Sequence, residues 1–219
     1  MKAKLLTSLL CGLATWASSA ADSAVRKWDF ENAQAGTLPA GWIAARTGTG
    51  SGSVWHVRAD ATSPHGSKTL AQTSSEGPNP LFNLCVAEGA SYADMDLTVS
   101  FKSISGEKDQ GGGLLWRYQD ANNYYVARFN PLEDNYRVYK VIGGERRQLA
   151  TADAEAAAGK WHTLRVVHQG DQMKCYLNGK LHLETSDVGI AKAGKVGLWT
   201  KADAVTAFDG LTVESKKSR

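Results

Sequence analysis

The sequence predicts an all-β fold in which two antiparallel sheets pack face to face as a sandwich. Apolar and polar residues alternate in short runs, and turn residues interrupt these runs roughly every 8 to 14 positions. Gly-Gly, Gly-Asp and Asn-Gly pairs at 143–144, 170–171 and 178–179 suit the backbone conformations of tight hairpins. Only residues 152–158 have a helical composition, and this stretch is short enough to form one or two surface turns.

The predicted strands are rich in β-branched and aromatic residues, as strands generally are. In chain order they cover residues 26–30, 55–58, 69–72, 81–86, 95–102, 112–118, 124–130, 136–142, 146–150, 161–168, 173–177, 180–185, 195–200 and 205–214. So many strands in one chain of 219 residues predict two large sheets in a single domain.

The N-terminal residues have the composition of a targeting segment. Lys2 and Lys4 precede an apolar run at 5–14, and small residues follow it. This order is typical of a secretory signal peptide, and the apolar run is shorter than the roughly 20 residues that span a bilayer. We expect a signal peptide at 1–20, one sandwich domain at 22–214 and a disordered basic tail at 215–219. The protein is then exported, to the periplasm or the extracellular space.

The charge balance bears on possible partners. The chain has 25 Lys and Arg against 22 Asp and Glu. Two of the basic residues fall in the signal peptide and three in the tail, so the domain between them is close to neutral. Proteins that bind nucleic acid present a concentrated basic face, so this balance argues against a nucleic-acid partner. We expect no transmembrane segment after the signal peptide, and a monomer.

Two cysteines, Cys85 and Cys175, remain after the signal peptide. An oxidising compartment permits a disulfide between them. Cys175 alternates with Met173 and Leu177 and should be buried, whereas Cys85 is out of phase with its apolar neighbours. The sequence therefore does not decide whether the disulfide forms. Two cysteines without nearby histidines do not form a zinc site.

Residues 112–130 are predicted to form a β-hairpin with residues 119–123 in its turn. If Tyr118 pairs with Tyr125, one face of the hairpin is apolar and belongs to the core. The same register makes Arg117 and Arg128 diagonal neighbours on the other face. Neighbouring arginines repel one another unless an acceptor lies between them, and a protein carboxylate or a ligand would both serve.

A second candidate region is the end of the strand at 195–200. Trp199, Lys201 and Asp203 follow one another there. An exposed tryptophan beside polar groups commonly holds a sugar ring, although a buried Trp199 in the core fits the sequence as well. Trp161 is expected in the core.

Paired carboxylates would be needed for glycosidic bond cleavage. Asp94 and Asp96 share one face of a strand, and the alternation of their neighbours predicts that both point outward. Asp203 is a third candidate. Two further pairs of acidic residues, at 107 and 109 and at 133 and 134, lie in loops, and the sequence does not show where their side chains point. No arrangement of serine and histidine indicates a hydrolytic triad.

A structural calcium ion is a further possibility. Glu31 follows the first predicted strand and Asp209 lies in the last one. If these two strands pair, both carboxylates could offer the hard oxygen ligands that Ca²⁺ prefers. We otherwise expect no cofactor.

Several motifs resemble those of concanavalin A-like and laminin G-like jelly rolls. They are WDFE at 28–31, LPAGW at 38–42, GLLWRYQD at 113–120, KWHTLRV at 160–166, YLNGK at 176–180, GLWTKAD at 197–203 and FDGL at 208–211. The resemblance is greatest to the exported bacterial group of 3-keto-disaccharide hydrolase-like, family 16 glycoside hydrolase-like domains. It implies a jelly-roll sandwich that meets carbohydrate on a concave sheet or a rim of loops. The Glu-x-Asp-x-x-Glu motif of family 16 glycosidases is absent.

Three functions are consistent with these observations. The first is carbohydrate recognition, with the ligand-binding candidates Arg117, Tyr124, Arg128, Asn130, Trp199 and Lys201. The second is hydrolysis of glycosides or 3-keto-disaccharides, with the catalytic candidates Asp94, Asp96 and Asp203. The third is a structural or adhesion domain of the cell envelope, because a fold does not fix a function.

Overall fold

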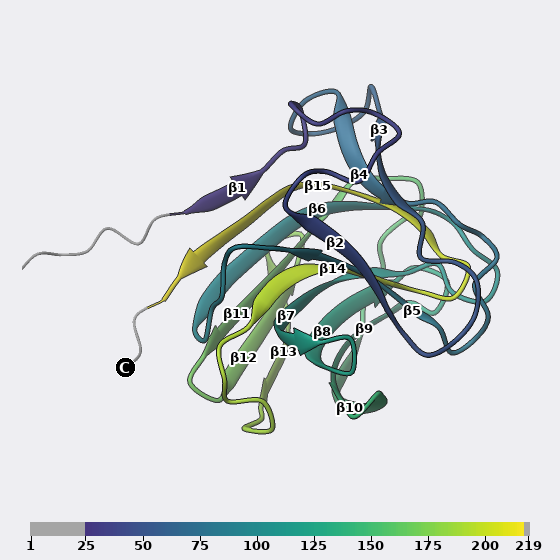
Figure 1. Cartoon of the computed structure of the whole chain (residues 1–219). Helices are drawn as coiled ribbons and strands as arrows, with labels where there is room; N and C mark the ends of the chain where they lie inside the picture. The colour runs from purple at the N-terminus through teal and green to yellow at the C-terminus, as the bar shows by residue number, and fades with distance from the viewer. Residues whose placement is uncertain (1–24, 217–219) are drawn as a thin grey trace, which may run out of the picture.

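The computed structural model describes residues 25–216, and these residues form an all-β sandwich, as the sequence predicts (Figure 1). The strands are β1 (Arg26–Trp28), β2 (Trp42–Thr47), β3 (Trp55–Ala59), β4 (Lys68–Gln72), β5 (Phe82–Ala87), β6 (Met95–Ser105), β7 (Gly112–Asp120), β8 (Asn123–Asn130), β9 (Asn135–Ile142), β10 (Glu145–Asp153), β11 (His162–Gln169), β12 (Gln172–Leu177), β13 (Lys180–Ser186), β14 (Lys195–Lys201) and β15 (Val205–Ser215). No helix occurs among the described residues.

The strands form two antiparallel sheets. The eight-stranded sheet has the order β13-β12-β11-β6-β15-β4-β3 with β1 paired to β15, and the seven-stranded sheet has the order β10-β9-β8-β7-β14-β5-β2. β6 and β15, of 11 residues each, pair along the long axis of the sandwich, about 35 Å. Ser105 pairs with Val205 at one end of this axis and Met95 with Ser215 at the other. We call these the Ser105 end and the Met95 end.

The seven-stranded sheet is so strongly curved that distant strands touch across its outer face. β10 and β5 are five steps apart in the sheet order, a separation of about 24 Å in a flat sheet. Yet the guanidinium carbon of Arg146 on β10 lies 4.9 Å from the ring centre of Phe82 on β5. Similarly, Thr47 Oγ1 on β2 lies 2.8 Å from Tyr124 Oη on β8. We call this outer face the concave face.

Apolar side chains fill two layers. The larger cluster lies between the sheets and includes Trp116 stacked on Tyr125, with 5.7 Å between the ring centres. The smaller cluster lies in the middle of the concave face and includes Phe82, Tyr124 and Trp199. Because the curvature brings both edges of the sheet over this cluster, its core members are all less than a tenth exposed. The middle of the concave face is therefore already filled.

The structure corrects the predicted register of the β7–β8 hairpin. Tyr125 pairs with Trp116, not with Tyr118. A shift of two positions leaves the side chains up to Trp116 on their predicted faces. Beyond Trp116 a β-bulge interrupts the pairing, and Arg117 within it has a φ of 45°, which is uncommon for a residue other than glycine. The bulge turns Arg117 away from Arg128.

The structure confirms the predicted strand ends, but it contradicts the predictions for residues 152–158 and for Trp161. Strand ends agree within three residues, but β2 was missed because its alanines are poor strand formers. Residues 152–158 do not form helical turns, since Ala152 and Asp153 complete the pairing of β10 with β9. Trp161 is partly exposed rather than in the core, and the Lys102 ammonium lies 4.8 Å from its ring centre.

Cys85 and Cys175 are both buried and free, so they form no disulfide. Cys85 lies on β5 in one sheet and Cys175 on β12 in the other, and both line the core between the sheets. Burial raises the pKa of the Cys85 thiol and of the Cys175 thiol.

The two termini can be described only in part. The predicted signal peptide lies outside the described residues. Ser215 is the last residue of β15, and Lys216 Nζ donates a hydrogen bond of 2.9 Å to Glu214, so these two residues extend the domain instead of beginning a disordered tail. Residues 217–219 lie outside the described residues. Within 25–216, no helix has the length and apolar character needed to cross a membrane.

His168 couples the stability of the fold to pH. Its Nδ1 accepts a hydrogen bond of 2.8 Å from Trp116 Nε1 inside the core. Burial, together with the nearby Arg117 guanidinium, lowers the pKa of His168 from 6.5 to about 4. Between these values the unfolded chain binds a proton that the folded chain excludes, so stability falls as the pH drops through this window.

We expect the free energy of unfolding to fall by up to about 3 kcal/mol through His168 as the pH is lowered from 6.5 to about 4. Urea unfolding at several pH values measures this loss. His168→Asn keeps an acceptor for Trp116 but does not titrate, so its pH dependence should be shallower than that of the wild type. Equal slopes for the two proteins would contradict the assignment.

Candidate functional site

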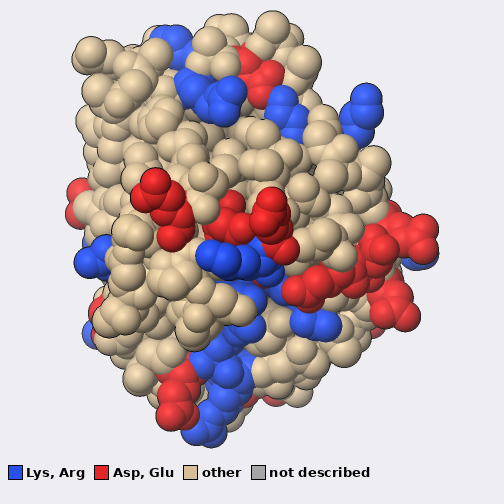
Figure 2. Space-filling view, turned by 90° about the vertical axis from the view of Figure 1, so that its right-hand side faces the viewer, with Lys and Arg blue, Asp and Glu red and all other residues tan. Residues whose placement is uncertain are grey.

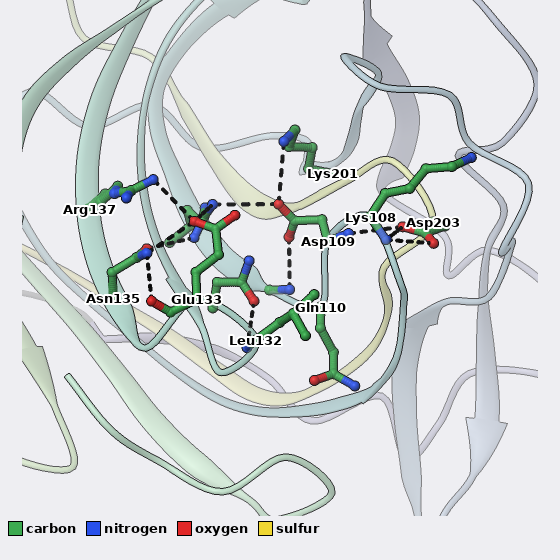
Figure 3. Close-up of polar contacts among 12 residues, drawn as sticks. Lys108, Asp109, Gln110, Leu132, Glu133, Asn135, Arg137, Lys201 and Asp203 are labelled. Atoms are coloured by element: carbon green, nitrogen blue, oxygen red, sulfur yellow. Dashed lines mark hydrogen bonds and ion pairs between the residues drawn. The ribbon is translucent and has the colours of Figure 1, made fainter. Parts of the chain in front are cut away.

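Charged and amide side chains gather at the Ser105 end of the concave face (Figure 3). Strand register places some of them on this face, because Arg128 pairs with Arg137 and Asn130 with Asn135 across β8 and β9. Lys201 is the last residue of β14, and loops contribute Asp109 and Glu133. We call the group the rim cluster, and its members are Asp109, Arg128, Glu133, Asn135, Arg137 and Lys201. On the side of the molecule shown in Figure 2, acidic and basic side chains are interleaved near the centre.

Arg128 is the centre of the rim cluster. Its side chain is 1% exposed, and its Nη2 lies 3.5 Å from Asp109 Oδ2 and 3.1 Å from Glu133 Oε2. Its Nη1 donates a hydrogen bond of 2.9 Å to Asn135 Oδ1. Such charge-assisted bonds hold the planar guanidinium in one orientation.

Glu133 is a member of the rim cluster that reaches the surface. It lies in the turn between β8 and β9, and its side chain is 34% exposed. Its Oε2 accepts hydrogen bonds from Arg128, Asn135 and Arg137, at 3.1, 3.0 and 3.1 Å. Burial alone would raise the pKa of Glu133, but the donors from Asn135 and Arg128 outweigh it and lower the pKa. Glu133 is therefore a carboxylate at neutral pH.

Asp109 is fully buried and joins Arg128 to Lys201, whose Nζ lies 3.6 Å from Asp109 Oδ2. The loop that carries Asp109 is held by Asp203, which accepts hydrogen bonds of 2.8 to 3.1 Å from the backbone N–H groups of Glu107, Lys108 and Asp109. Burial opposes ionisation of Asp203, yet these donors lower its pKa. Asp203 thus fixes the backbone of this loop.

The predicted ligand residues divide between the rim cluster and other places. Arg128, Asn130 and Lys201 meet at the Ser105 end, as expected. Trp199 and Tyr124 lie on the same face but are fully buried in its apolar cluster. Burial raises the pKa of Tyr124, whose hydroxyl contacts Thr47. Neither ring is available as a platform for a sugar.

Arg117 lies apart from the rim cluster, at the Met95 end. Its guanidinium donates hydrogen bonds to the backbone oxygens of Ala93, Ile190 and Gly170 at 2.8 to 2.9 Å, and its Nη2 lies 3.5 Å from Asp94. These groups belong to three different loops at the Met95 end. The prediction that Arg117 and Arg128 are neighbours is wrong, because Arg128 pairs with Gly113, four residues before Arg117, and Arg117 lies in the bulge near the Met95 end. Arg117 is a structural link between loops.

The three catalytic candidates do not meet. Asp94 is buried beside Arg117, so the expectation that it points outward is wrong. Asp96 lies on the outer face of the eight-stranded sheet, where Arg165 Nη2 approaches it to 2.6 Å. Asp203 is at the Ser105 end, about 30 Å along β6 from Asp94. Asp203 therefore cannot act on one bond together with Asp94 or Asp96.

Glu31 and Asp209, the calcium candidates, both fasten the loop before β4. Glu31 accepts hydrogen bonds from the backbone N–H groups of Ser67 and Lys68, and Asp209 accepts one from that of His65. The pairing of β1 with β15 is as expected. Among residues 25–216, no group of three or more His, Cys, Asp or Glu side chains is placed to hold a metal ion. The calcium ion stays a prediction.

Four members of the rim cluster were not predicted: Asp109, Glu133, Asn135 and Arg137. Their sequence signal was weak because the two carboxylates are in loops and their partners come from elsewhere in the chain. Asn135 and Arg137 could have been found from the β8–β9 register, since residues opposite Asn130 and Arg128 share their face.

Comparisons with known proteins agree with this architecture. The family model described as a 3-keto-alpha-glucoside-1,2-lyase-like domain matches residues 29–214. The chain is 28% identical over 148 residues to the levanase of Bacillus subtilis (strain 168), a match that covers 66% of the chain and 20% of the levanase. The chain therefore spans about a fifth of the length of that relative.

Solved structures show the same fold. The carbohydrate binding module CBM66 from Bacillus subtilis superimposes with a TM-score of 0.63 at 22% identity, covering 80% of this chain and 96% of the module. The GH43 protein BlXynB from Bacillus licheniformis gives a TM-score of 0.55 at 17% identity, covering 87% of this chain and 39% of that protein.

Replacing Arg117 should cost stability without touching the rim cluster. Arg117→Met leaves a buried Asp94 carboxylate without its cation, which generally costs about 3–5 kcal/mol. Urea unfolding measures the change. Arg165→Met is the matched control, because its ion pair with Asp96 is partly exposed and should contribute about 1 kcal/mol or less. Equal losses in the two variants would refute the structural role of Arg117.

Proposed function

The chain belongs to the 3-keto-alpha-glucoside-1,2-lyase-like domain family, and we propose that it binds carbohydrate through the rim cluster at the Ser105 end of its concave face. The observation that carries this proposal is the convergence of three cations and two carboxylates at one end of a face that is otherwise apolar and filled.

The chemistry of the rim cluster suits hydroxyl groups. A sugar hydroxyl both donates and accepts hydrogen bonds, so it is best held between a carboxylate and a cation. Glu133 and Arg137 are each about one-third exposed, and their charges are 3.1 Å apart. A ligand can therefore contact an acceptor and a donor at the same place.

Two buried donors beneath this surface add to the argument. Arg128 Nε and Asn130 Nδ2 have no hydrogen-bond partner within the described chain. A buried donor without a partner costs about 1–3 kcal/mol. A ligand oxygen that reached either group, directly or through a water molecule, would recover part of that cost. Buried polar groups generally have a hydrogen-bond partner.

The relatives suggest which sugar to test first. Because the chain is similar to part of a levanase, levan is the first polysaccharide to offer it. The signal-like N-terminus supports export of the protein. An exported protein would meet polysaccharide outside the cytoplasm.

Catalysis is the second candidate function, and one observation favours it. The carboxylates of Asp109 and Glu133 both reach Nη2 of Arg128, so the rim cluster holds a carboxyl pair. Cleavage of glycosides generally needs one carboxyl group as a proton donor. The lowered pKa of Glu133 disfavours that role, and Asp109 is fully buried. These properties make binding the better proposal.

We expect Arg137→Gln to weaken the binding of levan oligosaccharides about tenfold, because it replaces the charged guanidinium beside Glu133 with a shorter, neutral amide. Isothermal titration calorimetry measures the dissociation constants. Arg147→Gln is the matched control, since Arg147 lies on β10 and is 69% exposed outside the cluster. If both variants bind like the wild type, the rim cluster is not the site. If no sugar in a broad glycan panel binds the wild type, the proposed function fails.

Catalysis is tested separately with 3-keto-glucosides and levan oligosaccharides as substrates. If the rim cluster is catalytic, Glu133→Gln should lower the rate of product formation at least about a hundredfold. Asp96→Asn, outside the cluster, should leave the rate within about twofold. Activity that survives Glu133→Gln would exclude a catalytic rim cluster, and absence of product from the wild type would leave binding as the function.

A further inference from the structure

One surface groove adjoins the turn that carries Glu133, and a second groove adjoins the first. The first, of about 380 Å³, is lined by Pro131 and Asp134 of this turn and by Glu155 with the alanines that follow it. The second, of about 450 Å³, is lined by Asp153, Glu155, Lys180 and His182. Glu155 lines both grooves, so they are contiguous.

The grooves are fixed in position relative to the rim cluster. The backbone N–H of Ala154 donates a hydrogen bond of 3.0 Å to the backbone oxygen of Asp134, the residue next to Glu133. Asp153 pairs with Asn135, a member of the cluster. Farther along, the His182 ring on β13 lies 6.4 Å from the ring of Tyr136 on β9. A path therefore runs from the rim cluster over the edge of the seven-stranded sheet to β13.

The lining of this path has the composition of a sugar-binding surface. Asp153 and Glu155 offer acceptors, while Lys180 and His182 offer donors. Small apolar side chains at 156–158 lie between the carboxylates and the turn. Interleaved donors, acceptors and small apolar patches match a chain of sugar rings, whose edges carry hydroxyls and whose faces are apolar.

We propose that the two grooves continue the rim cluster as additional subsites, so that the protein binds an extended oligosaccharide chain and not only a terminal sugar. The inference rests on the proposed function, because the rim cluster supplies the first subsite. Each further sugar in the grooves adds contacts with Glu155, Lys180 and His182, and affinity rises with the length of the chain.

The test compares oligosaccharides of two to six sugars, cut from levan and from glucans, by isothermal titration calorimetry. We expect the best-bound series to gain at least about fivefold in affinity between the disaccharide and the hexasaccharide. Glu155→Ala with Lys180→Ala should abolish this gain while changing disaccharide affinity by less than about twofold. Lys27→Ala, on β1 away from the grooves, is the control.

The possible outcomes separate the two proposals. If the disaccharide binds and longer chains bind no better, the groove subsites are overturned and the rim-cluster site stands. If the gain with length survives in the double variant, the grooves are likewise excluded. If neither series binds at any length, the proposed function itself fails, and the groove subsites fail with it.

Discussion

The buried guanidinium of Arg128 is the group on which the Ser105 end of the molecule depends. A charge taken out of water without a partner costs several kcal/mol even after the surroundings relax. Arg128 is 1% exposed, so the fold has to bring carboxylates to it, and these come from Asp109 and Glu133 in two separate loops. Asp203 then fixes the backbone of the first loop. The arrangement of both loops follows from the need to neutralise one cation, and the same groups form the surface that we assign to the ligand.

Curvature decides where on the concave face a ligand can bind. A concave sheet often offers its centre to a sugar, but here the edges of the sheet approach each other so closely that aromatic rings fill the centre. Arg146 lies across Tyr139 and Phe82, with its guanidinium carbon 4.3 and 4.9 Å from their ring centres, and Thr47 bonds the Tyr124 hydroxyl. Glu133 of the rim cluster reaches solvent in the turn between β8 and β9. We therefore place the proposed site and its proposed groove subsites at the rim, beside loops that can vary without disturbing either apolar cluster.

The sequence predicted the fold well because alternation and turn residues are local signals. Three predicted ligand residues, Arg128, Asn130 and Lys201, lie together at the Ser105 end, since strand periodicity puts them on one face, and their role in binding stays a prediction. The errors are non-local. The true register and the bulge at Arg117 could not be read from alternation, and together they separate Arg117 from Arg128. Trp199 was undecidable, because its burial depends on the curvature of the whole sheet. Asp109 and Glu133 were passed over, since only the fold brings their loops to Arg128.

The central claim is that carbohydrate binds at the rim cluster, and mapping of backbone amide chemical shifts during titration with levan oligosaccharides tests it most directly. The account predicts that the perturbed amides cluster at 107–111, 130–137 and 200–203, with smaller changes along 153–158. Perturbations confined to the outer face of the eight-stranded sheet, or to the loops around Arg117 at the Met95 end, would contradict it.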